Sequence, residues 1–215
     1  MAKNPEQRLP ALRSVEAGPG VLVHPTVDQQ VSAEEWLISA HPVPRQARAE
    51  LREHGVVLLP LGGLFSAVRI PGRIVQALAA STDPADIDTV LTEVLADGPV
   101  ICAVGGPRYY ALVPPSMPQT WRDAAEDWRG DDVACLGRES YLGMPALAAV
   151  DYPQTGATVY WSVPPRPGIL CEPLAVARLV AAGVHLLGDE CDPWPANAPL
   201  TPHRGVLPRM TLRGI

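Results

Sequence analysis

Two short apolar segments separated by a turn-rich tetrapeptide constrain the fold of this chain most. Residues 100–104 are Val-Ile-Cys-Ala-Val and residues 109–113 are Tyr-Tyr-Ala-Leu-Val, with Gly105-Gly106-Pro107-Arg108 between them. Strands joined by so few residues pair antiparallel, because a parallel pair needs a crossover of a dozen residues or more. The sequence therefore predicts an antiparallel hairpin near the middle of the chain.

Helix and strand signals alternate on both sides of this hairpin. A helix over residues 45–54 is predicted to stop at Gly55, and the apolar run 56–60 after it is typical of a buried strand. A further strand is expected over 64–70. Asp83 followed by Pro84 is the N-cap and first position of a helix.

Two more helix boundaries are predicted from local signals. Ser32-Ala33-Glu34-Glu35 fits a capping box and predicts a helix that starts at Ser32. An apolar helix over 172–182 is expected to end at Gly183. Short strands interspersed with helices predict an α+β fold, with a mixed or antiparallel sheet flanked by helices.

The two ends of the chain differ from the middle. Residues 1–30 show no sustained hydrophobic period and are expected to form an extended N-terminal arm. Residues 189–215 are Pro-rich and are expected to form a tail rather than a second core. The folded domain is therefore placed at 31–188.

Composition limits the functions that the chain can have. The net charge is −6, whereas proteins that grip nucleic acid nonspecifically are usually basic. Sixteen arginines against one lysine, with 25 prolines, indicate a high-GC genome of the actinobacterial type. Widely spaced cysteines, no signal peptide and no long apolar run predict a cytoplasmic protein with reduced thiols and no membrane contact.

The sequence favours neither zinc binding nor thiol catalysis. The candidate zinc ligands are far apart in sequence and match no compact motif; they are Cys171, His185, Cys191 and His203. No spacing recommends a catalytic cysteine–histidine pair. The sequence predicts no metal and no cofactor.

From about Arg45 to Val180, the order of several segments resembles one known family. Gly55-Val56-Val57-Leu58-Leu59-Pro60-Leu61 opens the series, followed by Gly105-Gly106-Pro107-Arg108-Tyr109-Tyr110. Tyr141-Leu142-Gly143-Met144-Pro145 and the stretch from Gly156 to Trp161 complete it. This order is similar to that of the primase/polymerase (prim-pol) domain of bifunctional DNA primase/polymerases, in the archaeo-eukaryotic primase superfamily.

The resemblance implies a nucleotidyl-transfer fold whose metal ligands are missing here. Family members carry Asp-x-Asp on a strand, where this chain has Ala67 and Arg69. Asp151 is the one candidate for a third acidic ligand. In the family a histidine contacts the nucleotide phosphates, and this chain has Arg108 or Tyr109 near the position of that histidine. The resemblance thus predicts a catalytically degenerate protein.

Two sets of site residues follow. Arg69, Arg73, Arg108 and Tyr109 are candidates for binding phosphate or nucleotide; the alternative is that the arginines are solvated charges. The candidates for base stacking are Tyr110, Tyr141, Tyr160 and Trp161; the alternative is that these rings fill the core.

Two functions remain open at this point. The first is a non-enzymatic scaffold that binds DNA, a nucleotide or a partner, tied to DNA replication or a mobile element. The second is a small cytoplasmic protein that oligomerises or binds a protein partner through its Pro-rich tail and has no nucleic-acid role.

Overall fold

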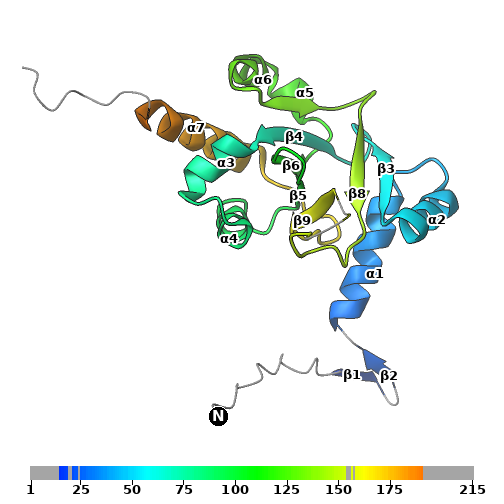
Figure 1. The fold of residues 1–215 in the computed structure, drawn as a ribbon. Helices are drawn as coiled ribbons and strands as arrows, with labels where there is room; N and C mark the ends of the chain where they lie inside the picture. Colours follow the sequence, from blue (N-terminus) through cyan, green and yellow to red (C-terminus); the bar gives the residue numbers. More distant parts are fainter. Residues whose placement is uncertain (1–14, 19–20, 24, 154–155, 157, 191–215) are drawn as a thin grey trace, which may run out of the picture.

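The chain folds around a five-stranded sheet, seen in a computed structural model that describes residues 15–18, 21–23, 25–153, 156 and 158–190 (Figure 1). The strand order is β7-β4-β6-β5-β9, and every neighbouring pair is antiparallel. The strands are β4 (Ser66–Pro71), β5 (Val100–Ala103), β6 (Arg108–Val113), β7 (Ala134–Leu136) and β9 (Val159–Val163). The α+β class is confirmed, and the predicted central hairpin is β5–β6.

Two smaller antiparallel pairs accompany the main sheet. Strands β3 (Val56–Pro60) and β8 (Tyr141–Pro145) form a ribbon, although 80 residues of chain lie between the end of β3 and the start of β8. Strands β1 (Val15–Gly18) and β2 (Val21–Val23) form the other pair. The segment 1–30, predicted as an extended arm, therefore contains a short β-hairpin within its described residues.

Helices cover both faces of the main sheet. They are α1 (Pro25–Ile38), α2 (Pro44–His54), α3 (Gly72–Ala79), α4 (Pro84–Val94), α5 (Met117–Thr120), α6 (Arg122–Asp127) and α7 (Pro173–Glu190), with a 3₁₀ turn at Trp128–Asp131. In Figure 1, α3, α4 and α7 lie on one side of the sheet, while α1, α2 and the β3–β8 ribbon lie on the other.

Each face of the sheet has its own hydrophobic core. The alternation of strand β4 shows this division, because Val68 and Ile70 pack beneath α3, α4 and α7, whereas Ala67 packs toward α1 and α2. Trp161, with no exposed surface, is the largest side chain of the second core. The sheet is thus buried on both sides, and free surface is left mainly at its ends.

Several predicted boundaries are confirmed. Helix α2 ends at Gly55, which adopts the left-handed conformation at φ 70°, and its N–H bonds to the carbonyl of Leu51 at 2.9 Å. Asp83 caps α4 by accepting a 2.8 Å hydrogen bond from the N–H of Ala85, and Pro84 holds the first helical position.

Two helix boundaries were predicted wrongly. Helix α1 begins at Pro25, so Ser32 lies inside it; the Ser-x-x-Glu pattern can also occur within a helix. Helix α7 continues through Gly183 to Glu190. A Cβ on Gly183 would lie 2.4 Å from the carbonyl oxygen of Ile74, so this glycine lets α7 approach α3 closely rather than stopping the helix.

The Pro-rich segment 191–215 lies outside the described residues, and so does the oligomerisation predicted for it. Among the residues that are described, no helix is long and apolar enough to cross a membrane. Cys102, Cys135 and Cys171 are free thiols, of which Cys102 and Cys171 are buried as small apolar side chains.

Candidate functional site

Three of the predicted phosphate-binding residues come together in one cleft. Arg69 on β4, Arg73 on α3 and Arg108 on β6 line a hollow of about 390 Å³ at the end of the main sheet. Their positions follow from the register, in which Arg69 pairs with Tyr110 and Pro71 pairs with Arg108. The adjacent strands β4 and β6, and helix α3 that follows β4, therefore each place one guanidinium group in this cleft.

A close backbone contact holds the two sides of this arginine cleft together. The N–H of Gly72, the first residue of α3, donates a 2.8 Å hydrogen bond to the carbonyl of Pro107 in the β5–β6 turn. A Cβ on Gly72 would lie 2.6 Å from the Cβ of Pro107. Only glycine permits this approach, which fixes the start of α3 beside the turn that precedes Arg108.

The arginine cleft is electropositive. Arg73 donates hydrogen bonds to Asp132 Oδ2 at 3.2 Å and to the carbonyl of Asp131 at 2.7 Å, which fix its guanidinium. Within the part of the chain that the structure describes, the guanidinium groups of Arg69 and Arg108 form no hydrogen bond or ion pair. One carboxylate, Asp132, lines the cleft against three arginines, so two positive charges remain for an anion.

The start of helix α3 adds to this potential. Its N-cap is Pro71, whose side chain accepts no hydrogen bond from the first turn. The N–H of Gly72 is bonded to Pro107, but the other N–H groups of the first turn and the positive end of the helix dipole lie beside the three guanidinium groups. The combination suits phosphate oxygens, which accept hydrogen bonds and carry negative charge.

Tyr109, the fourth predicted phosphate ligand, lies on the other face of the sheet. It is 3% exposed and packs in the core under α3, α4 and α7. Burial raises the pKa of its phenol, with Cys102 beside it on the neighbouring strand. Its assignment as a phosphate ligand was wrong, because residues 108 and 109 of a strand point to opposite faces.

The predicted base-stacking residues are mostly part of the core. Tyr160 and Trp161 are 1% and 0% exposed, which leaves no ring surface for a base. The indole Nε1 of Trp161 donates to the carbonyl of Pro145 at 3.1 Å. Tyr110 is half-buried against the α1–α2 core. Tyr141, at the start of β8, is 66% exposed and is the one of the four with an open ring.

A buried polar cluster that the sequence did not predict lies under α4. Asp88 accepts hydrogen bonds from the Tyr160 hydroxyl at 3.1 Å and from the Ser162 hydroxyl. Burial raises the pKa of the Asp88 carboxyl despite these two hydrogen bonds, and it raises the pKa of the nearby Cys102 thiol to about 11. A signal existed, because Asp88 lies three residues before Leu91 of the buried face of α4, and residues at this spacing share a helix face.

The cluster of Asp88, Tyr160 and Ser162 connects helix α4 to the main sheet and does not open to a cleft. Tyr109, Cys102 and Tyr160 lie in one cross-strand row on β6, β5 and β9. Tyr152 packs edge-on against Tyr160, with ring centroids 5.6 Å apart. The hydrogen bonds of Asp88 anchor α4 to β9, and the high thiol pKa makes Cys102 a poor nucleophile.

The predicted metal-ligand positions do not form a metal site within the described residues. Ala67 is fully buried and Arg69 lines the arginine cleft, so β4 presents no carboxylate at these alternate positions; Asp151 is exposed in a bend. Among the described residues, no three histidine, cysteine or acidic side chains gather as a metal site. Cys171 lies just before α7, and His185 lies within α7. The 14 residues between them correspond to about 20 Å along a helix, too far for both to bind one zinc ion. Cys191 and His203 lie outside the described residues.

Comparison of the chain with family models, curated proteins and solved structures gives no significant match.

Proposed function

We propose that this protein is a catalytically degenerate relative of the prim-pol domain that binds phosphate groups of DNA or of a nucleotide. The observation that carries the proposal is the arginine cleft, where Arg69, Arg73 and Arg108 gather beside the start of α3, which has no side-chain cap. Guanidinium groups bind phosphate through paired N–H donors, and two of these three have no competing partner among the described residues.

The proposal assigns no catalysis to this cleft. Two-metal nucleotidyl transfer needs carboxylates on a rigid edge to hold both metal ions. Strand β4 has the rigidity, lying between β6 and β7, but it carries Ala67 and Arg69 where the resemblance expects acids. An arginine at such a position favours an anion and opposes a metal ion.

The test is fluorescence polarisation of the full chain with labelled single-stranded, duplex and primed DNA and with a labelled nucleotide, across a salt series. We expect binding of at least one probe that weakens linearly with log salt. Arg69→Ala and Arg108→Ala should each lower the affinity. For a single-stranded probe, each should also reduce the salt slope by about 0.7, the value for one lost phosphate contact.

Arg45→Ala is the matched control, because Arg45 is an exposed arginine of α2 and lies outside the arginine cleft. It should leave both affinity and slope unchanged. No binding of any probe at low salt would refute the proposal, as would equal losses in Arg45→Ala and Arg108→Ala. Metal-dependent primer extension by the wild-type chain would refute the assignment as catalytically degenerate.

A further inference from the structure

The outer face of the β3–β8 ribbon is apolar and exposed. The inner face packs in the second core through Val57, Leu59, Leu142 and Met144, so the residues that alternate with these point outward. The outward residues that remain accessible are Val56, Leu58, Pro60, Tyr141 and Gly143. None of them is charged. Tyr141 and Leu58, at 66% and 60%, are the two most exposed large hydrophobic side chains in the described part of the chain.

The sequence of β3 is typical of a strand that is buried on both faces. Val-Val-Leu-Leu-Pro has an apolar residue at every position, whereas a strand with one solvated face alternates apolar and polar residues. The structure covers only one of the two faces, because Leu59 is 0% exposed while its neighbour Leu58 is exposed. The pattern therefore indicates that the outer face is covered in an assembly.

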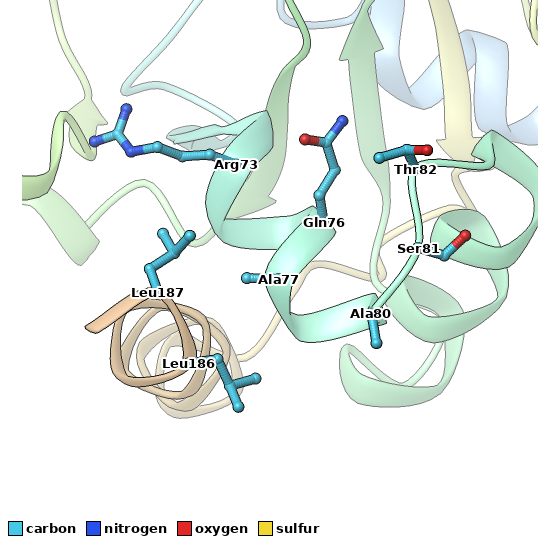
Figure 2. Close-up of a pocket in the computed structure, with 8 residues that line it drawn as sticks. All are labelled: Arg73, Gln76, Ala77, Ala80, Ser81, Thr82, Leu186 and Leu187. Carbon is cyan, nitrogen blue, oxygen red and sulfur yellow. The ribbon is translucent and has the colours of Figure 1, made fainter. Parts of the chain in front are cut away.

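An exposed apolar residue elsewhere has different surroundings. Leu186 of α7 lines an open hollow of about 920 Å³ between α3 and α7, the α3–α7 groove, which Arg73 also lines. Figure 2 shows the polar side chains of Gln76 and Ser81 in the same lining. An apolar side chain among polar ones is ordinary at a protein surface, whereas a contiguous uncharged face marks an interaction site.

The outer face of the ribbon has a projection beside a free space. Leu58 lies directly opposite Gly143 in the register of β3 and β8. Gly143 has no side chain, and a Cβ placed there would meet only Cγ1 of Val56, at 3.4 Å. The isobutyl group of Leu58 thus stands next to a position that is open. Tyr141 lies in the same way opposite Pro60, which has a compact ring.

We propose that the outer face of the ribbon is the contact surface of a two-fold symmetric dimer. When two ribbons pack face to face around an axis parallel to their strands, β3 of each copy lies over β8 of the other. Leu58 then lies over Gly143 of the second copy, and Pro60 lies against the ring of Tyr141 of the second copy. The axis repeats each contact, so both projections fill both spaces. This self-complementary shape is the reason that a second copy of the chain fits the face.

The size and charge of the face predict a weak dimer. With five residues in each strand, the ribbon is about 17 Å long and about 10 Å wide. Stable complexes bury about 1,200–2,000 Å² in total, so a contact of this size belongs to the weaker class, with a dissociation constant in the micromolar range or above. Each copy has a net charge of −6, so two copies repel each other, and an uncharged face lowers this cost at the contact.

Sedimentation equilibrium of the full chain from about 5 µM to about 500 µM tests the dimer. We expect the average mass to rise with concentration from that of one chain toward that of two. Added salt should strengthen the association, because it screens the repulsion between the two negatively charged copies. Leu58→Asp should weaken it by about tenfold or more, because it places a charge in the centre of the contact.

Gly143→Leu separates the proposed packing from general stickiness of an apolar face. The new side chain fills the space over which Leu58 of the second copy lies, so the association should weaken by about tenfold. A face that is merely apolar would instead associate more tightly. The double variant Leu58→Ala with Gly143→Leu moves the projection from β3 to β8 and should regain most of the association. Circular dichroism checks that each variant is folded.

Leu174→Asp is the matched control, because Leu174 lies on α7, outside the ribbon, and is 42% exposed. It should leave the association unchanged. A monomer at every concentration, tighter association in Gly143→Leu, or a loss in Leu174→Asp as large as in Leu58→Asp would overturn the inference. Leu58 does not line the arginine cleft, so DNA binding by Leu58→Asp should match that of the wild type, and the proposed function is tested separately.

Discussion

Helix α7 contains two glycines, five residues apart, that should respond in opposite directions to the same substitution. A Cβ on Gly183 would lie 2.4 Å from the carbonyl oxygen and 2.5 Å from Cγ2 of Ile74 in α3. A Cβ on Gly188 would meet nothing within 4 Å. Alanine raises helix stability at both sites, by less at Gly188 near the end of α7, so most of the difference between them reports the contact of Gly183 with α3.

The magnitude for Gly183→Ala follows from the geometry. Ordinary contact starts at 3.4 Å, so the new methyl group is about 1 Å too close to a backbone carbonyl that cannot rotate away. Overpacking of this kind costs about 1–3 kcal/mol, and the upper end applies because α3 and α7 must separate. Subtracting about 1 kcal/mol for helix propensity leaves a net loss of about 2 kcal/mol in the free energy of unfolding.

Gly188→Ala should gain about 0.5 kcal/mol, less than the full propensity difference because Gly188 lies two residues before the end of α7. Urea unfolding followed by circular dichroism measures both values. For a chain of this length, the melting temperature should fall by about 4–8 °C in Gly183→Ala and rise by about 1–2 °C in Gly188→Ala. A Gly183→Ala variant as stable as the wild type would refute the close approach of α7 to α3.

Two further predictions concern helix α4. Asp83→Ala should cost about 1 kcal/mol, because it removes the acceptor for the N–H of Ala85, whereas Asp83→Ser should retain most of that stability; urea unfolding of the two variants measures this, and equal losses would contradict the cap. Because burial raises the pKa of Asp88 in the folded state, its contribution to stability is fully present below its unfolded pKa of about 4 and is lost as pH rises through the folded pKa. The stability of Asp88→Asn relative to wild type should therefore increase from about pH 4 upward, and a pH-independent difference would contradict the shift.

Local signals predicted much of the secondary structure. The end of α2 at Gly55 and the start of α4 at Asp83 depend on hydrogen bonds between residues at most four positions apart. Both can therefore be predicted from a short stretch of sequence. The β5–β6 hairpin is determined in the same way by its turn. Ser32 shows the limit of such signals, because the pattern around it fits a helix start while α1 begins at Pro25.

The candidate site depends on contacts between residues that are far apart in the sequence. The sequence nominated Arg69, Arg73 and Arg108 individually, and their convergence in one cleft follows from the pairing of β4 with β6 and from the contact between Gly72 and Pro107. The groove beside them exists because α7, a hundred residues further along the chain, packs against α3.

The sequence by itself determined the element types, the antiparallel hairpin and the absence of carboxylates at Ala67 and Arg69, since these are properties of residue identity and near neighbours. Only the tertiary structure decided what each face of β6 packs against, so that Tyr109 joins the core under α3, α4 and α7 while Arg108 lines the arginine cleft. It also decided that Gly183 is a contact point rather than a helix end. The physical reason is that burial and close approach depend on which distant elements pack together, and the identity of one residue does not contain that information.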